Sequence, residues 1–214
     1  PDLNIISPCV RFGLETALID LWGKITGSTA ANIIGVKESN PIPCNAIIAT
    51  SDVKKAVTEA VNAKSLGFTS LKLKVGQGSA HNDEVLLSSV REAIGPKIKL
   101  RVDANQAWTV KEAIRRIQKL EEYTLEYVEQ PSAKGNLMSM KEINESVEVK
   151  IAADESLSSL SDLEDIIKTN AADILVVKPN RIGGFSKTLE VISEAIRSKK
   201  SVVVTTSLDS SLGI

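Results

Sequence analysis

The chain has 214 residues, enough to bury a sizeable core as one large domain or as one domain plus a fragment. Its 26 basic residues nearly balance its 27 acidic ones and form no basic run, so the charge pattern of a nucleic-acid or anionic-membrane binder is excluded. Every apolar stretch is far shorter than the roughly 20 residues that span a bilayer. Chemistry on a small molecule is therefore the starting hypothesis.

The two cysteines, Cys9 and Cys44, have no CxxC spacing, and the single histidine, His81, lies in a polar segment. We expect both cysteines to be reduced structural thiols, which favours a cytoplasmic location. No targeting peptide is visible at the start, and we expect the sequence to begin within a longer protein.

The first predicted element is an amphipathic helix over Pro8–Lys24 (PCVRFGLETALIDLWGK). Its apolar residues available for burial are Phe12, Ala17, Leu18, Leu21 and Trp22. We interpret residues 1–40 as the remnant of a preceding domain. The NPIP segment that begins at Asn40 is a plausible linker, because its two prolines break any helix and favour extended backbone.

From Ile42 onward, apolar strand-like runs alternate with amphipathic helix-like runs. Strands are expected at 42–50, 69–75, 97–104, 125–131, 150–156, 172–179 and 201–208. Helices are expected at 51–67, 81–95, 109–122, 136–147, 160–170 and 184–200. Ser51 and Thr109 stand where helix N-caps belong, and Gly67 and Gly95 stand where helices end. This alternation predicts an α/β fold with a parallel sheet.

The position of the polar residues favours a closed barrel over an open sheet. No glycine-rich phosphate loop follows an early strand, as a doubly wound sheet would usually have. Ionisable residues instead occur at the C-terminal ends of five consecutive strands, and such ends converge in a (β/α) barrel. We therefore predict a TIM-like (β/α)7β barrel over residues 41–214, incomplete at the C-terminus, with an eighth strand expected beyond Ile214.

Two lysines on the second predicted strand have the same facing. Side chains alternate along a strand, so Lys72 and Lys74 point into the barrel while Leu71, Leu73 and Val75 meet the helices. An interior lysine loses solvation, which is expected to lower its pKa and to allow a neutral amine that acts as a base.

Three carboxylates, Asp103, Glu129 and Asp154, lie at or near the ends of three neighbouring strands. They would repel one another unless a cation neutralised them. All-oxygen ligation favours a hard ion such as Mg²⁺. The alternative is that each acid caps the helix that follows it.

Further polar residues extend this predicted site. Lys178 follows the sixth strand, across the barrel from the other lysines, and either takes part in proton transfer or neutralises the carboxylates. Asn105 shares the facing of Asp103 and either orients a ligand or caps a turn. Gly183 and Gly184 either present backbone amides to an anion or form a tight turn.

The motifs KxK, DAN, EQP, DES and KPN follow one another on successive predicted strands. In this order the chain resembles the muconate-lactonizing subgroup of the enolase superfamily, over nearly its whole length. The resemblance implies an α+β capping domain, of which residues 1–40 would be the C-terminal part and linker. Residues 41–214 would be the barrel domain.

The resemblance also implies the metal ligands. Asp103, Glu129 and Asp154 would bind Mg²⁺, which holds the substrate carboxylate and stabilises the enediolate that forms when the α-proton leaves. The substrate would be a small-molecule carboxylate, and no nucleic acid or membrane would take part.

The lysines receive their roles from the same resemblance. Lys74 would be the base and then the acid, and Lys178 would stabilise the enediolate from the opposite face. Lys72 would support Lys74 electrostatically.

Within the subgroup, the segments SPCVRFGLETAL, DANQAWT, IAADESL and TTSLDSSLGI are most similar to the o-succinylbenzoate synthases of menaquinone biosynthesis. This similarity implies a lyase that eliminates water, with Ser207 and Ser211 contacting the succinyl or carboxylate groups. Dipeptide epimerases and N-acylamino-acid racemases, which use the lysine pair for two-base 1,1-proton transfer, are the alternative. A non-catalytic paralogue is disfavoured, because interior lysines and clustered acids cost stability without a use.

Overall fold

The structure is a computed structural model that describes residues 6–36, 40–207 and 209. The strands in these ranges are β1 (Ala46–Ile48), β2 (Ser70–Lys74), β3 (Lys99–Asp103), β4 (Leu125–Glu129), β5 (Ile151–Ala153), β6 (Ile174–Val177) and β7 (Ser201–Val204). The helices are α1 (Pro8–Thr26), α2 (Ala30–Ile33), α3 (Val53–Ser65), α4 (Ala80–Ile94), α5 (Val110–Leu120), α6 (Leu137–Ser146), α7 (Leu160–Thr169), α8 (Pro179–Ile182) and α9 (Phe185–Arg197), with a 3-10 turn η2 (Glu121–Tyr123). Within the described residues, no helix has the length and apolar character needed to cross a membrane.

The strands form one sheet in the chain order β1 to β7, and the pairs from β1–β2 to β4–β5 are parallel. A helix follows each of the first six strands. This order is the strand order of a (β/α) barrel. The predicted α/β fold class, an incomplete TIM-like barrel, is therefore confirmed. The short helices α2 and α8 were not predicted, because a single helical turn gives too little periodicity to detect.

Helix boundaries follow the expected local chemistry with one correction. The side chain of Thr109 caps α5 as predicted. The predicted N-cap Ser51 is wrong by one residue, since the carboxylate of Asp52 caps α3. Gly67 and Gly95 have positive φ values of 90° and 75°, which glycine adopts more readily than other residues.

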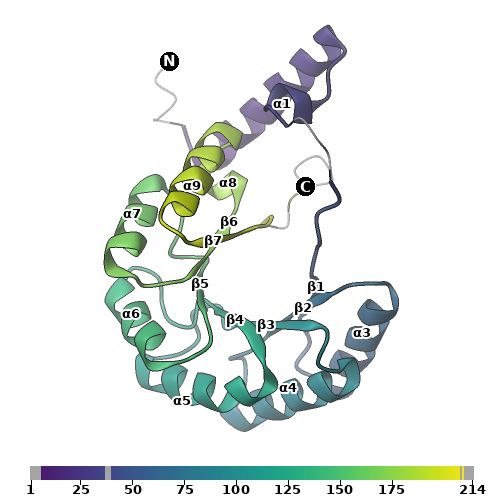
Figure 1. Cartoon of the computed structure of the whole chain (residues 1–214), viewed down its shortest axis with the longest axis vertical. Helices are drawn as coiled ribbons and strands as arrows, with labels where there is room; N and C mark the ends of the chain where they lie inside the picture. Colours follow the sequence, from purple (N-terminus) through teal and green to yellow (C-terminus); the bar gives the residue numbers. More distant parts are fainter. Residues whose placement is uncertain (1–5, 37–39, 208, 210–214) are drawn as a thin grey trace. The chain divides into compact units, whose positions relative to one another are not determined.

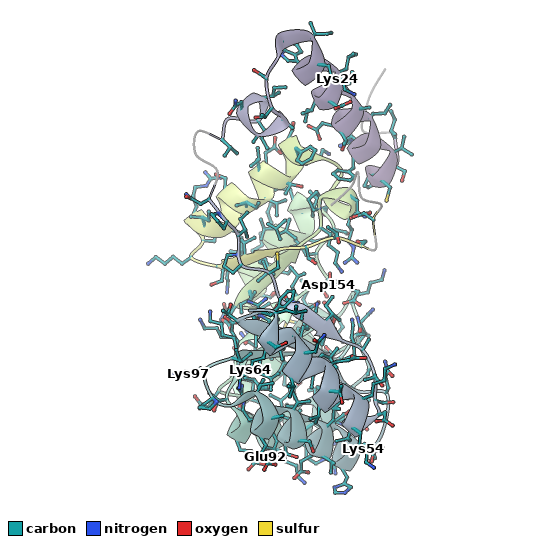
Figure 2. All side chains as sticks on the ribbon, turned by 90° about the vertical axis from the view of Figure 1, so that its right-hand side faces the viewer. Lys24, Lys54, Lys64, Glu92, Lys97 and Asp154 are labelled. Atoms are coloured by element: carbon teal, nitrogen blue, oxygen red, sulfur yellow. The ribbon has the colours of Figure 1, made fainter. Side chains whose placement is uncertain are left out.

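The chain divides into two compact units, and the larger one comprises residues 42–156 and 166–174. In this unit α3, α4, α5 and α6 lie along the outer side of the strands (Figure 1). Leu71 and Leu73 on β2 are fully buried, as predicted for side chains that face the helices. Lys54 and Lys64 on α3, which are labelled in Figure 2, are exposed. The predicted strand facing is thus confirmed on β2.

The smaller unit comprises residues 1–41, 157–165 and 175–214, and in it α1 packs on α8. The rings of Phe12 and Phe185 lie 5.6 Å apart. The other apolar residues of α1, which the sequence marks as available for burial, are exposed in the described chain. Leu18, Leu21 and Trp22 are 65%, 54% and 63% exposed, and Ala17 is also exposed. The contacts of α1 with the segment around α8 and α9 involve residues of its first half, such as Phe12 and Glu15. The domain boundary between residues 40 and 41 stays a prediction.

Candidate active site

Three neighbouring strands place charged side chains side by side at their C-terminal ends. Lys74 on β2 is the register partner of Asp103 on β3, and Asp103 is the register partner of Glu129 on β4. Register partners on adjacent strands point to the same face of a sheet. The alternation of side chains therefore brings these three residues together, as the sequence predicted.

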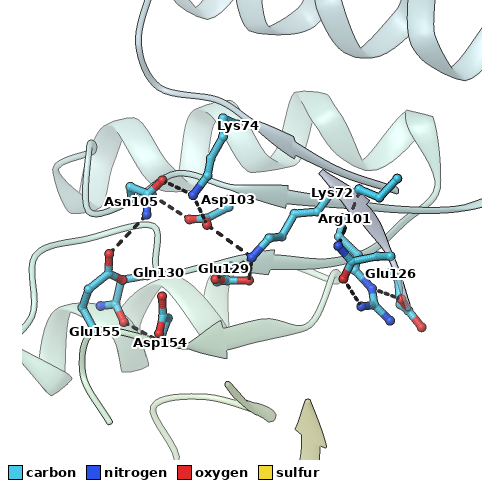
Figure 3. A network of polar contacts seen from close by, with 12 residues as sticks. Lys72, Lys74, Arg101, Asp103, Asn105, Glu126, Glu129, Gln130, Asp154 and Glu155 are labelled. Atoms are coloured by element: carbon cyan, nitrogen blue, oxygen red, sulfur yellow. Dashed lines mark hydrogen bonds and ion pairs between the residues drawn. The ribbon is translucent and has the colours of Figure 1, made fainter. Parts of the chain in front are cut away.

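The first lysine of the KxK motif is held by two carboxylates (Figure 3). The Nζ atom of Lys72 lies 3.1 and 3.0 Å from the two carboxylate oxygens of Glu129 and 3.5 Å from Oδ2 of Asp103. The side chain of Lys72 is 11% exposed, and both carboxylates are 1% exposed. This is a buried ion cluster rather than a surface salt bridge.

Lys74, the second lysine of the KxK motif, is connected through Asn105 to Glu155, an acid that the sequence argument did not single out. Nζ of Lys74 donates to Oδ2 of Asp103 and to Oδ1 of Asn105, both at 2.6 Å. The side-chain amide of Asn105 then donates to Oε1 of Glu155 at 3.2 Å (Figure 3). Oε2 of Glu155 is buried and has no hydrogen-bond partner among the described residues. Asn105 therefore contacts the proposed base and does more than close a turn.

The third predicted carboxylate, Asp154, follows β5 and is 2% exposed. Its backbone N–H donates to Oε1 of Gln130 at 3.0 Å. The negative charge of Asp154 is one of the causes that raise the pKa of Glu129. Asp154 thus belongs to the same electrostatic cluster as the acids on β3 and β4.

Burial and charge pull the pKa values of these groups in different directions. Burial, with the charges of Asp103 and Asp154, raises the pKa of Glu129 to about 7, despite the opposing charge of Lys72. Burial also acts to raise the pKa of Asp103, but the hydrogen bond from Lys74 and the charges of both lysines outweigh it and lower the value. The carboxylates therefore compete for a limited positive charge.

The expectation that burial lowers the lysine pKa is wrong for Lys72. Burial does act in that direction, but the nearby charges of Glu129 and Asp103 outweigh it and raise the pKa. The sequence argument counted the loss of solvation and omitted the counter-ions. In this arrangement Lys72 is a protonated ammonium.

The donor chemistry of the cluster fits a hard divalent cation. Asp103, Glu129 and Asp154 offer only oxygen donors, and each is almost completely buried. Their mutual charge already shifts the pKa of Glu129, which a cation would relieve. Within residues 6–36, 40–207 and 209, no three His, Cys, Asp or Glu side chains are arranged as a ready ligand set. The ammonium groups of Lys72 and Lys74 contact the carboxylates instead, so a cation would have to replace these contacts.

The remaining predicted residues lie in the smaller unit. Lys178 follows β6 and precedes α8, where its carbonyl accepts the N–H groups of Arg181 and Ile182. The hydroxyl of Ser207 donates to the side chain of Asn180 at 3.2 Å. Ser211 lies outside the described residues. The catalytic role of Lys178 and the substrate contacts of the two serines stay predictions.

The double glycine after Lys178 does not present free amides, because the N–H groups of Gly183 and Gly184 both donate to the carbonyl of Pro179. The carboxylate of Glu15 on α1 accepts the backbone N–H groups of Phe185 and Ser186 at the start of α9. A Cβ atom on Gly184, which has a φ of 115°, would lie 1.9 Å from a Glu15 oxygen. The anion at this helix start is thus a side chain of the protein itself.

Two further residues near the site were missed by the sequence argument. Asp83 on α4 is 5% exposed, and its two oxygens accept the N–H of Gly76 at 3.2 Å each. Nη1 of Arg116 donates to the same carboxylate at 2.9 Å. A Cβ atom on Gly76 would lie 2.6 Å from the Cβ of Ala107, so the loops after β2 and β3 are in tight contact.

The other missed residue is Gln130, whose side chain is completely buried next to Glu129. The signal was present in the EQP motif, since a polar amide directly after a strand-end acid needs buried partners. Its contacts connect the ends of β4 and β5.

The known proteins that this chain resembles include dipeptide epimerases and a chloromuconate cycloisomerase. A hydrophobic dipeptide epimerase of Enterococcus faecalis is 32% identical over 189 residues, which cover 88% of this chain and 53% of that protein. A chloromuconate cycloisomerase of Cupriavidus pinatubonensis is 31% identical, with coverage of 95% and 55%. The crystal structure of a dipeptide epimerase from Cytophaga hutchinsonii, complexed with Mg and the dipeptide D-Ala-L-Val, matches with a TM-score of 0.91 and 31% identity over 99% of this chain and 58% of that one.

The chain spans about half the length of the curated relatives it matches. The family model described as enolase C-terminal domain-like matches residues 53–213, which include every strand-end motif described above. The chain belongs to the enolase C-terminal domain-like family.

Proposed function

We propose that this chain is the barrel domain of a Mg²⁺-dependent enzyme that moves the α-proton of a small carboxylate substrate. The observation that carries this proposal is the buried cluster of Lys72, Lys74, Asp103 and Glu129 at the ends of three parallel strands. Such a cluster costs stability in the absence of a use, because several charges are removed from water together. Its lysines and acids supply both proton transfer and cation binding.

In this proposal Asp103, Glu129 and Asp154 hold the cation. When bound, Mg²⁺ supplies a positive charge that holds the substrate carboxylate and stabilises the negative charge left by the departing proton. The Mg-complexed relative from Cytophaga hutchinsonii supports this assignment.

The lysines divide the proton chemistry. Lys74 removes the α-proton through Nζ, and Asn105 keeps this atom oriented through the observed 2.6 Å contact. Lys72 provides a fixed positive charge beside Lys74. We propose that Lys178 returns a proton to the α-carbon on the opposite face of the substrate.

Among reactions of this kind, we favour epimerisation of a dipeptide or an N-acyl amino acid. The relatives named above include two dipeptide epimerases, and one of them was crystallised with a dipeptide. They therefore support the epimerase alternative better than the o-succinylbenzoate synthase preferred from sequence segments. The synthase stays the second candidate because of the segments around DANQAWT and IAADESL.

The test incubates the full chain with Mg²⁺ in D₂O and offers two substrates separately. One is a dipeptide of the L-Ala-L-Glu or hydrophobic type, and the other is the cyclohexadiene carboxylate precursor of o-succinylbenzoate. Deuterium at the α-carbon with inversion supports the epimerase, whereas loss of water supports the synthase. Absence of Mg²⁺-dependent exchange with either would contradict the proposed function and favour a non-catalytic paralogue.

The role of the base is tested by Lys74→Ala, with Lys54→Ala on the exposed surface of α3 as the matched control. Removing a positioned base is expected to slow exchange by about 10³-fold or more, while circular dichroism stays unchanged. The control should exchange at the rate of the unmodified chain. Persistence of rapid exchange in Lys74→Ala would sink the base assignment.

A further inference from the structure

Gln130 occupies an unusual position directly after Glu129 at the end of β4. Its side chain is 0% exposed, and its backbone has a φ of 39°, in the left-handed region that residues other than glycine rarely adopt. Asparagine or glycine would adopt this backbone more easily. The presence of glutamine indicates that the side chain has a use that outweighs the backbone preference.

The side-chain amide of Gln130 makes hydrogen bonds on both its ends. Oε1 accepts the backbone N–H groups of Asp154 and Ser156 at 3.0 and 3.1 Å. Nε2 donates to the carbonyl of Ser132 at 2.9 Å and to the hydroxyl of Ser156 at 2.8 Å. A primary amide has two donor hydrogens and two acceptor lone pairs, so all four are used. The amide therefore has one satisfied orientation, and the turn from Asp154 to Ser156 is fixed to it.

The backbone of Gln130 joins two more segments to the same point. Its N–H donates to the carbonyl of Ala152 on β5 at 2.8 Å, and its carbonyl accepts the N–H of Gln106, after β3, at 2.8 Å. The neighbouring carbonyl of Glu129 accepts the N–H of Ala104 at 3.1 Å. One residue thus holds the ends of β3, β4 and β5 together.

These three strand ends carry Asp103, Glu129 and Asp154. A cation site needs its ligands held within a few tenths of an ångström of their proper separation, and groups behind the ligands often provide this. Asp103 and Glu129 are already placed by sheet register. Asp154 follows β5 rather than lying within it, and its backbone N–H donates to the amide oxygen of Gln130.

We propose that Gln130 is a positioning residue that sets the separation of Asp154 from Glu129 and thereby the affinity of the site for a divalent cation. The proposal rests on the proposed function, because it assumes that these acids bind the cation. Gln130 acts through the backbone of Asp154 and not through contact with the cation or the substrate.

The test replaces Gln130 with asparagine in the full chain. Asparagine tolerates the left-handed backbone and keeps the amide, but it is one methylene shorter and cannot reach Asp154 and Ser156 together. Binding of Mn²⁺, used as a probe for Mg²⁺, is measured by isothermal titration calorimetry. The affinity of Gln130→Asn is expected to fall by about 10- to 100-fold.

Gln118→Met is the matched control, because the amide of Gln118 also donates to a backbone carbonyl, that of Ser146, but lies between α5 and α6. Its Mn²⁺ affinity should stay within about twofold of the unmodified chain, as expected for sites without a shared partner. A second variant, Gln130→Met, keeps the side-chain length and removes the hydrogen bonds of the side-chain amide. It is expected to lose at least as much Mn²⁺ affinity as Gln130→Asn, so it tests the proposal if that variant fails to fold.

The outcomes separate the two proposals. If the unmodified chain binds Mn²⁺ and a folded Gln130 variant binds it equally well, the positioning role is overturned and the proposed function stands. If the unmodified chain binds no Mn²⁺, both are overturned. Loss of Mn²⁺ affinity in folded Gln130 variants, with the control unchanged, supports the positioning role.

Discussion

Lysine and carboxylate side chains meet in two different settings in this protein. On the outer surface of α3, Lys55 and Glu59 lie 3.9 Å apart, with side chains 66% and 39% exposed. At the strand ends, Lys72 and Glu129 lie 3.0 Å apart, with side chains 11% and 1% exposed. The surface pair is screened by water and contributes about 0–1 kcal/mol. In the buried pair the pKa of each partner is raised: the neighbouring carboxylates outweigh burial at Lys72, and burial outweighs the charge of Lys72 at Glu129.

The largest effect on stability is expected at the buried ion pair between Asp83 and Arg116. Asp83→Ala leaves Arg116, whose side chain is 12% exposed, without its partner and removes the acceptor of the Gly76 N–H. Breaking a buried pair in this way is expected to lower the free energy of unfolding by about 3–5 kcal/mol. Urea denaturation measures this loss. A change below about 1 kcal/mol would show that this pair behaves like a surface pair.

The next effect concerns pH in the absence of metal. The pKa of Glu129 is raised from 4.5 to about 7, so the folded chain holds a proton that the unfolded chain releases earlier. The stability that this proton supplies is complete below pH 4.5 and is lost as the pH rises through about 7. The expected loss is about 3 kcal/mol.

Urea denaturation in EDTA between pH 4.5 and pH 8 measures the pH effect. Glu129→Gln should remove this part of the pH dependence, whereas Glu59→Gln should retain it. An unchanged pH profile in Glu129→Gln would mean that another group carries the effect.

Glu15, a carboxylate of intermediate exposure, should make an intermediate contribution to the free energy of unfolding. Glu15→Ala removes the acceptor for the N–H groups of Phe185 and Ser186 at the start of α9. Loss of a helix cap is expected to cost about 0.5–2 kcal/mol. Thermal denaturation of Glu15→Ala and Glu15→Gln measures this, and the glutamine variant should lose less because it keeps one acceptor oxygen. Equal stability of Glu15→Ala and the unmodified chain would contradict the capping role.

The smallest effect is expected at the surface pair itself. Glu59→Gln removes the charge facing Lys55 and should change the free energy of unfolding by less than about 0.5 kcal/mol. Urea denaturation at low and high salt measures it. A loss of more than about 1 kcal/mol in the free energy of unfolding would mean that the surface pair contributes as a buried pair does.

Periodicity in the sequence predicted the strands, the helices and the facing of β2, because alternation follows directly from strand geometry. It placed Lys74, Asp103 and Glu129 on one face, which the register confirms. It could not show that Lys72 has two carboxylate neighbours, since the choice of partner depends on side-chain rotamers. The direction of its pKa shift was therefore wrong.

Contacts between distant segments were also beyond the sequence argument. The amide of Gln130 bonds Ser156, which is 26 residues away in the chain. Glu15 reaches Ser186 across 171 residues. No local pattern encodes such pairs. The apolar residues of α1 were expected to be available for burial, but their spacing does not identify a partner, and Trp22 is 63% exposed.

The close contact between Gly76 and Ala107 has a consequence for engineering. The two loops that follow β2 and β3 fit together only while residue 76 lacks a side chain, since any Cβ there would lie 2.6 Å from that of Ala107. A loop grafted after one strand from a relative will therefore clash unless its neighbour is grafted with it. Loop grafts on this barrel should treat these two loops as a single module.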